Sequence, residues 1–186
     1  MQKIYFHLDK SEYFNNVTSE FIYLDEIDIT MEHSLYTISN WESIWHKPFL
    51  KKENKTKQEL FSYIQCMIVH PENINILYVY KLFNDKEMYN KIIDFINNEA
   101  TATTFNNIES NYSSNQFISS ELIYSWMSSL NIPYEPTEHW HINHLLTLIK
   151  VINENNKPKK KKTMNETLKD YSRLNEMRRK KYNTKG

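Results

Sequence analysis

Residues 26–49, EIDITMEHSLYTISNWESIWHKPF, contain the change in periodicity that decides the fold. Ile27, Ile29 and Met31 alternate with polar residues, which predicts a strand with one apolar face. From about Ser34 the pattern becomes that of an amphipathic helix, and Pro48 ends it because proline cannot continue a helix. The apolar side of this predicted helix is formed by Leu35, Ile38, Trp41 and Trp45.

The chain before this stretch predicts a second strand. Ile4, Phe6 and Leu8 alternate with Tyr5 and His7, and a polar loop is expected between this strand and the one at 27–31. Two or three strands are not stable alone in water. We therefore expect a short β-ribbon, residues 1–33, that packs on the helices that follow or on a partner.

The chain after this stretch, residues 34–156, predicts a helical domain. Thr56 with Glu59 and Asn84 with Glu87 have the spacing of capping boxes at helix starts. Residues 100–116 are polar and without periodicity, which predicts a surface loop. The prediction is an α+β fold, mainly α-helical, whose helices number about five: 34–47, 56–68, 84–96, 119–130 and 137–153.

The last segment, residues 157–186, has a different character. It carries 12 Lys or Arg and three acidic residues, a net charge of +9, whereas residues 1–156 carry a net charge of −9. Thr163 with Glu166 forms another predicted capping box, and Met164, Leu168 and Tyr171 follow at helical spacing. We expect a basic linker and an amphipathic helix to about Lys181. An interaction tail and a solvated terminus are equally good interpretations.

The single glycine, Gly186, excludes several enzyme classes. Phosphate loops, dinucleotide-binding turns and nucleophile elbows all need glycine within the chain. Cys66 is the only cysteine, so no disulfide can form within the chain. Without an apolar leader or a run of about 18 apolar residues, we expect a soluble protein of a reducing compartment, with no membrane association.

Metal and catalytic sites are not predicted. His139, His141 and His144 are the best candidate ligands, and a helix from Thr137 would place only the last two on one face. We interpret them as surface or helix-cap residues. Cys66 is interpreted as a small buried apolar residue and not a nucleophile. The expectation is therefore a protein that is not an enzyme and holds no cofactor.

Aromatic and basic side chains are the candidates for partner binding. We expect the four tryptophans of the chain to be buried in the core. If Trp41 or Trp45 were exposed instead, it would be the natural anchor of an interface. The lysine-rich tail, with Tyr171 and Tyr182 as stacking residues, also permits a nucleic-acid interpretation, which the acidic body disfavours. The candidate partner-binding residues are Trp41, Trp45, Phe49, Leu168, Tyr171, Arg178 and Arg179.

Several segments together resemble small proteins of tailed bacteriophages that act in virion assembly, especially tail assembly. They are MEHSLYTISNWESIWHKPFL (31–50), KTKQELFSYIQCM (55–67), SELIYSWMSSLNIPYE (120–135), WHINHLLTLI (140–149) and LNEMRRKKYNTKG (174–186). His144 departs from the family pattern, where a basic residue such as Arg is expected. The matching positions are Trp41, Glu42, Trp45, His46, Pro48, Phe49, Trp126, Pro133, Trp140, His141 and Asn143.

The resemblance implies a non-catalytic tail assembly chaperone or morphogenesis factor. Such a protein binds apolar segments of the tape-measure protein, keeps them soluble and helps to recruit tail-tube subunits in the host cytoplasm. One alternative is a structural connector, neck or tail-completion protein that stays in the virion. Another is an accessory protein that binds nucleic acid through the basic tail. A homo-oligomer is compatible with each.

Overall fold

The fold is α+β and mainly α-helical, as predicted, with small antiparallel sheets near the N-terminus. The computed structural model describes residues 2–51, 53–103, 117–157 and 164–183. Most of the predicted loop at 100–116, the lysine run at 159–162 and the cap at Thr163 lie outside the described residues. Contacts divide the chain into two units, Met1–Ile152 and Asn153–Gly186.

The two predicted strands form and pair. β1 (Ile4–Leu8) and β4 (Ile27–Met31) are antiparallel, with Phe6 opposite Ile29. β5 (Ile68–His70) pairs with the other side of β4 and completes a three-stranded sheet. The alternation seen in the sequence directs the apolar face of this sheet into the core.

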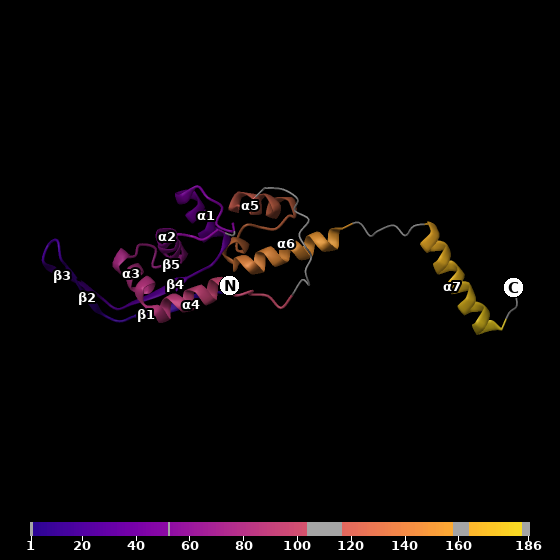
Figure 1. Cartoon of the computed structure of the whole chain (residues 1–186), viewed down its shortest axis with the longest axis horizontal. Helices are drawn as coiled ribbons and strands as arrows, with labels where there is room; N and C mark the ends of the chain where they lie inside the picture. Colours follow the sequence, from indigo (N-terminus) through magenta and orange to yellow (C-terminus); the bar gives the residue numbers. More distant parts are fainter. Residues whose placement is uncertain (1, 52, 104–116, 158–163, 184–186) are drawn as a thin grey trace. The chain divides into compact units, whose positions relative to one another are not determined.

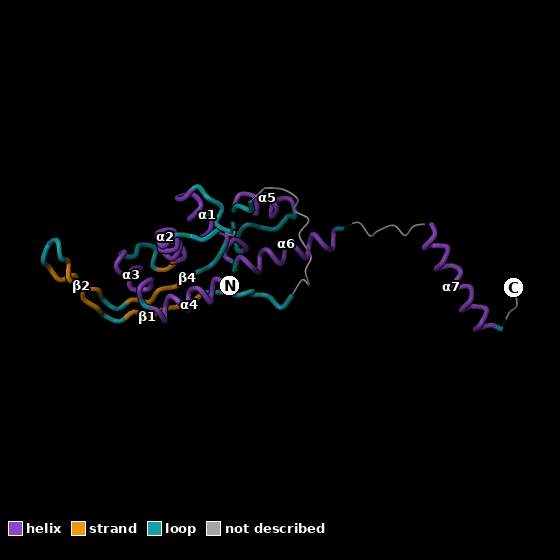
Figure 2. The backbone as a smooth tube through the Cα atoms, viewed as in Figure 1, coloured by secondary structure: helices purple, strands orange, loops and turns teal. Residues whose placement is uncertain are grey.

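The predicted polar loop between these strands is wrong, because it contains a second hairpin. β2 (Ser11–Asn15) and β3 (Glu20–Leu24) pair in antiparallel register and continue the ribbon away from the helices (Figures 1 and 2). The end of this hairpin nearest the helices contacts α3, because the Tyr78 hydroxyl donates to the Asp25 carbonyl oxygen at 2.9 Å.

The first two helices begin where the sequence predicts. α1 (Leu35–Trp45) starts at an N-cap, Ser34, whose hydroxyl accepts from the Thr37 amide. α2 (Lys57–Met67) starts at the predicted capping box, in which Thr56 and Glu59 cap each other's backbone amides. α1 packs against α2, and apolar residues of both helices and of the small sheet share one buried core.

The next two helices differ from the prediction. α3 (Ile76–Asn84) was not predicted. α4 (Lys86–Asn97) begins one residue later than expected, because Asp85 and not Asn84 is its N-cap. The Asp85 carboxylate accepts from the amides of Glu87 and Met88.

The next helices along the chain are α5 (Ser120–Ser129) and α6 (Ile142–Asn156), and the boundary between the two units falls within α6. The predicted start of the last helix at Thr137 is wrong. Residues Thr137–His139 form a short 3₁₀ turn, and His141 then pairs with Ser34 in an isolated β-bridge before α6 begins. In the second unit, α7 spans Met164–Tyr182.

Candidate functional site

Trp41 and Phe49, two of the predicted partner-binding residues, lie in the core. Trp41 is 1% exposed and Phe49 is 7% exposed, and their rings meet edge to face at 5.1 Å. The Trp41 indole N–H donates to the Glu59 carbonyl oxygen at 2.9 Å. Neither side chain forms the exposed anchor that we considered, because α2 covers both.

Trp45 is only partly covered. Its indole N–H donates to the Ser62 hydroxyl at 3.0 Å, and its ring stacks on Trp41 with 6.1 Å between centroids. Lys47 Nζ lies 6.0 Å from the Trp45 ring centroid. Contacts with α1 and α2 hold this ring in place, and partner binding through Trp45 stays a prediction.

The predicted residues of the tail helix are exposed. Leu168 and Tyr171 are both more than half exposed, and Met164 lies one turn before Leu168. Arg178 and Arg179 are exposed near the end of the same helix, whose last turn also carries Lys180 and Lys181. Basic side chains at a helix C-terminus interact favourably with the helix dipole. α7 thus presents apolar and basic groups, and their role in binding stays a prediction.

A surface that the sequence did not reveal lies on the β2–β3 hairpin. Phe14, Phe21 and Tyr23, here called the aromatic face, are 51%, 54% and 75% exposed. Phe14 is directly opposite Phe21 in the register, with 5.0 Å between ring centroids. Glu12 is opposite Tyr23 on the same face of the ribbon. The opposite face carries Tyr13 and Ile22, which pack toward the core.

A cluster of aromatic and imidazole rings lies inside the first unit. His33 is buried, its Nδ1 is hydrogen-bonded to the Tyr63 hydroxyl, and its ring meets that of His141 edge to face at 5.0 Å. His141 Nε2 lies 3.0 Å from the Phe95 carbonyl oxygen. Burial, with His141 and Lys55 nearby, lowers the pKa of His33 to about 3. Burial also lowers the pKa of His141. These imidazoles are therefore neutral at physiological pH and act as packing groups.

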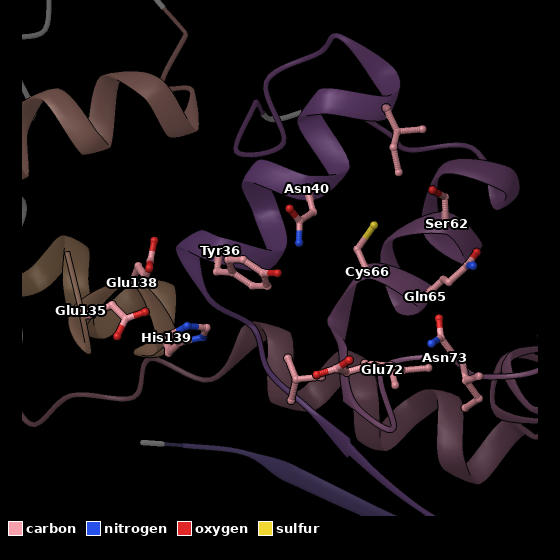
Figure 3. A pocket seen from close by; sticks show the side chains of 14 residues that line it. Tyr36, Asn40, Ser62, Gln65, Cys66, Glu72, Asn73, Glu135, Glu138 and His139 are labelled. Atoms are coloured by element: carbon pink, nitrogen blue, oxygen red, sulfur yellow. The ribbon is translucent and has the colours of Figure 1, made fainter.

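A cavity lies between α1, α2, the segment after β5 and the 3₁₀ turn (Figure 3). Its volume is about 880 Å³. Ser62, Gln65 and Cys66 line it from α2, and Glu135, Glu138 and His139 line it on another side (Figure 3). Of the 14 residues that line it, three are glutamates and none is Lys or Arg, so the cavity is electronegative.

Cys66 has an environment that disfavours nucleophilic chemistry. Burial raises the pKa of the Cys66 thiol to about 11. The thiolate is the reactive form of cysteine. The thiol therefore stays protonated near neutral pH. Cys66 is half-buried and lines the cavity, whereas the sequence predicted a buried residue.

The three histidines considered as metal ligands have separate partners. His139 Nδ1 lies 3.0 Å from Glu32 Oε2, His141 contacts the Phe95 carbonyl, and His144 stacks on Trp140 with 4.8 Å between centroids. His139 instead joins Glu135 and Glu138 in a group whose ligand atoms lie within 4.8 Å of one another. These three residues are close together in the sequence, but the convergence of their side chains depends on the fold of the 134–141 segment.

Comparisons with known proteins give no family for the chain: no family model, curated protein or solved structure matches it. Across the described residues, every helix is too short or too polar to cross a membrane.

Proposed function

We propose that the chain is a non-catalytic morphogenesis factor of tailed bacteriophages, of the tail assembly chaperone kind. In this proposal it binds apolar helical segments of the tape-measure protein or of tail subunits and keeps them soluble during assembly. The observation that carries the proposal is the aromatic face of Phe14, Phe21 and Tyr23, which projects on a two-stranded ribbon.

The chemistry of the aromatic face suits an apolar partner segment. Exposed apolar patches rimmed by polar groups are typical of sites for protein association. Phe and Tyr offer a large contact area, and aromatic residues are enriched in interfaces. An amphipathic helix that lays its apolar side on this face would bury rings that are now half to three-quarters exposed.

The charges around the aromatic face indicate which apolar segment fits best. Glu12 shares that face, and Glu20 is exposed at the turn end of β3. Residues 1–156 as a whole carry a net charge of −9. An apolar helix flanked by Lys or Arg would therefore gain electrostatic attraction as well as buried area.

The tail helix, α7, offers a second binding surface, which is basic whereas the residues near the aromatic face are acidic. α7 combines the exposed side chains of Leu168 and Tyr171 with basic residues in its last turn. Such a helix suits an apolar groove with an acidic rim. Tail subunits or another copy of the chain are the proposed occupants of this second contact.

The proposal is tested by co-expression with the tape-measure protein of the phage that encodes the chain. A chaperone keeps the tape-measure protein soluble, co-purifies with it, and is absent from mature particles by mass spectrometry. Presence in purified particles at a fixed copy number would identify a structural connector instead. A tape-measure protein whose solubility does not change with co-expression would contradict the proposal.

A further inference from the structure

Three side chains of the segment 135–139 converge beside the electronegative cavity. We propose that Glu135, Glu138 and His139 form a binding site for a divalent transition-metal ion, with Zn²⁺ as the best match. One ligand atom of each residue lies within 4.8 Å of those of the others. Ligand atoms around tetrahedral Zn²⁺ lie about 3.4 Å apart, so small side-chain rotations suffice to close the site. This site goes beyond the proposed partner binding, and neither depends on the other.

His139 is oriented for metal binding by a buried carboxylate. Glu32, which is 2% exposed, places Oε2 3.0 Å from His139 Nδ1, while Lys3 Nζ contacts its Oε1 at 2.8 Å. A carboxylate at Nδ1 favours the tautomer whose proton is on that nitrogen, so that Nε2 keeps a lone pair for a metal. Tyr36 packs on the imidazole with 5.0 Å between ring centroids, which limits its rotation.

Glu138 is supported in the same way. The Tyr124 hydroxyl donates to Glu138 Oε2 at 2.8 Å, which leaves Oε1 as a ligand atom. Glu135 is exposed and can adjust its position with little loss of packing. Two of the three ligands are thus held by side chains outside the group, as is common around protein metal sites.

The charge of the cavity favours a cation at this place. Glu72 lines the same cavity as Glu135 and Glu138, and no lysine or arginine lines it. Lys3 pairs with Glu32 behind the imidazole. A dication would offset the repulsion between the two ligand carboxylates.

The donor set selects the class of ion. One imidazole nitrogen and two carboxylate oxygens suit Zn²⁺ better than Mg²⁺ or Ca²⁺, which prefer oxygen ligands alone. Three protein ligands leave a coordination position for water or for a side chain of a bound protein. Within the described part of the chain, this is the group of three ligating side chains that lies close enough to hold an ion.

The test is calorimetric titration of metal-free, full-length protein with ZnCl₂, followed by titration with CoCl₂, whose visible spectrum reports the ligand geometry. We expect one ion per chain. Glu135→Gln, Glu138→Gln and His139→Gln should each weaken binding at least about tenfold, and Glu32→Gln, a positioning variant, by about 10-fold to 100-fold. His144→Gln is the matched control, because His144 stacks on Trp140 outside the group.

Two results would overturn the proposal. One is the absence of saturable Zn²⁺ binding by the wild-type chain. The other is binding that keeps its affinity in Glu135→Gln and His139→Gln, which would assign the ion to histidines elsewhere. Because Glu135 is exposed, its replacement keeps the fold, and the test does not depend on variants that remove buried groups.

Discussion

The buried imidazole of His33 makes the stability of the first unit depend on pH below neutrality. His33 packs against Phe49, Tyr63 and His141 and is hydrogen-bonded to the Tyr63 hydroxyl. Burial opposes its charged form and lowers its pKa to about 3. In the unfolded chain the same group has its ordinary pKa of about 6.5.

The size of the effect follows from these two values. Between pH 6.5 and pH 3 the unfolded chain binds a proton at His33 that the folded chain does not bind, so the folded state loses stability as the pH falls. With a folded pKa of about 3, His33 contributes about 2 kcal/mol less to the free energy of unfolding at pH 5 than at pH 7. His141, whose pKa is also lowered, adds to the loss in the same direction.

The assay is urea unfolding of the wild type and His33→Asn at pH 7 and pH 5. Asparagine has no charge change in this range, and its amide approximates the position of Nδ1. His33→Asn is expected to be less stable at pH 7, because ring packing is lost. The gap between the two proteins should shrink by about 2 kcal/mol at pH 5.

The matched control is His46→Asn. His46 is exposed at the end of α1 with φ of 52°, a conformation that asparagine tolerates. The His46→Asn variant should have nearly the same free energy of unfolding as the wild type at both pH 7 and pH 5. A gap between wild type and His33→Asn that stays the same from pH 7 to pH 5 would refute the account of this cluster.

Two further predictions concern the buried carboxylate of Glu42 and the half-buried thiol of Cys66. The buried Glu42 carboxylate accepts from the Phe49 amide at 2.6 Å and from the Ser120 amide at 2.7 Å, so Glu42→Gln should lower the free energy of unfolding by about 2 kcal/mol. Chemical denaturation measures this, and an effect no larger than that of the exposed control Glu53→Gln would contradict it. Cys66, with its pKa raised to about 11, should react with iodoacetamide at pH 8 about 100-fold more slowly in the folded than in the unfolded chain. Equal rates in the two states would show that the thiol is not shielded.

The parts of the fold that follow from local signals were predicted correctly. The strands at 4–8 and 27–31 alternate strictly, since one face is buried and the other is polar. The capping box of Thr56 and Glu59 sets the start of α2 through contacts within four residues. Such signals need no knowledge of the rest of the chain.

The parts that were missed depend on contacts far apart in the sequence or on exposed apolar residues. The β2–β3 hairpin does not alternate, because Phe14 and Phe21 are apolar on its solvent face. The residues before α6 read as helix, but the Ile142 amide donates to the His33 carbonyl at 2.9 Å and keeps the backbone extended there. The run at 76–84 is rich in β-branched and aromatic residues, which leaves strand and helix equally good interpretations.

The candidate site was predicted less well than the fold, for the same reason. Trp41 and Phe49 were reasonable anchors by residue type, yet α2 covers them. Glu138 adjoins His139 and Glu135 lies four residues before it, but the sequence does not show that their side chains converge on one side of a cavity. Residue type indicates which side chains can bind, and only the tertiary structure decides which of them are accessible.

Binding of a tail protein by the aromatic face is the step on which the proposed function depends. It is measured as the dissociation constant between the full-length chain and the tape-measure protein of the same phage, determined for the wild type and for Phe14→Ser/Phe21→Ser. The control is Tyr5→Ser, which removes an exposed ring from β1. The proposal predicts at least about tenfold weaker binding for the double variant and little change for the control. Equal affinity of the wild type and the double variant would contradict it.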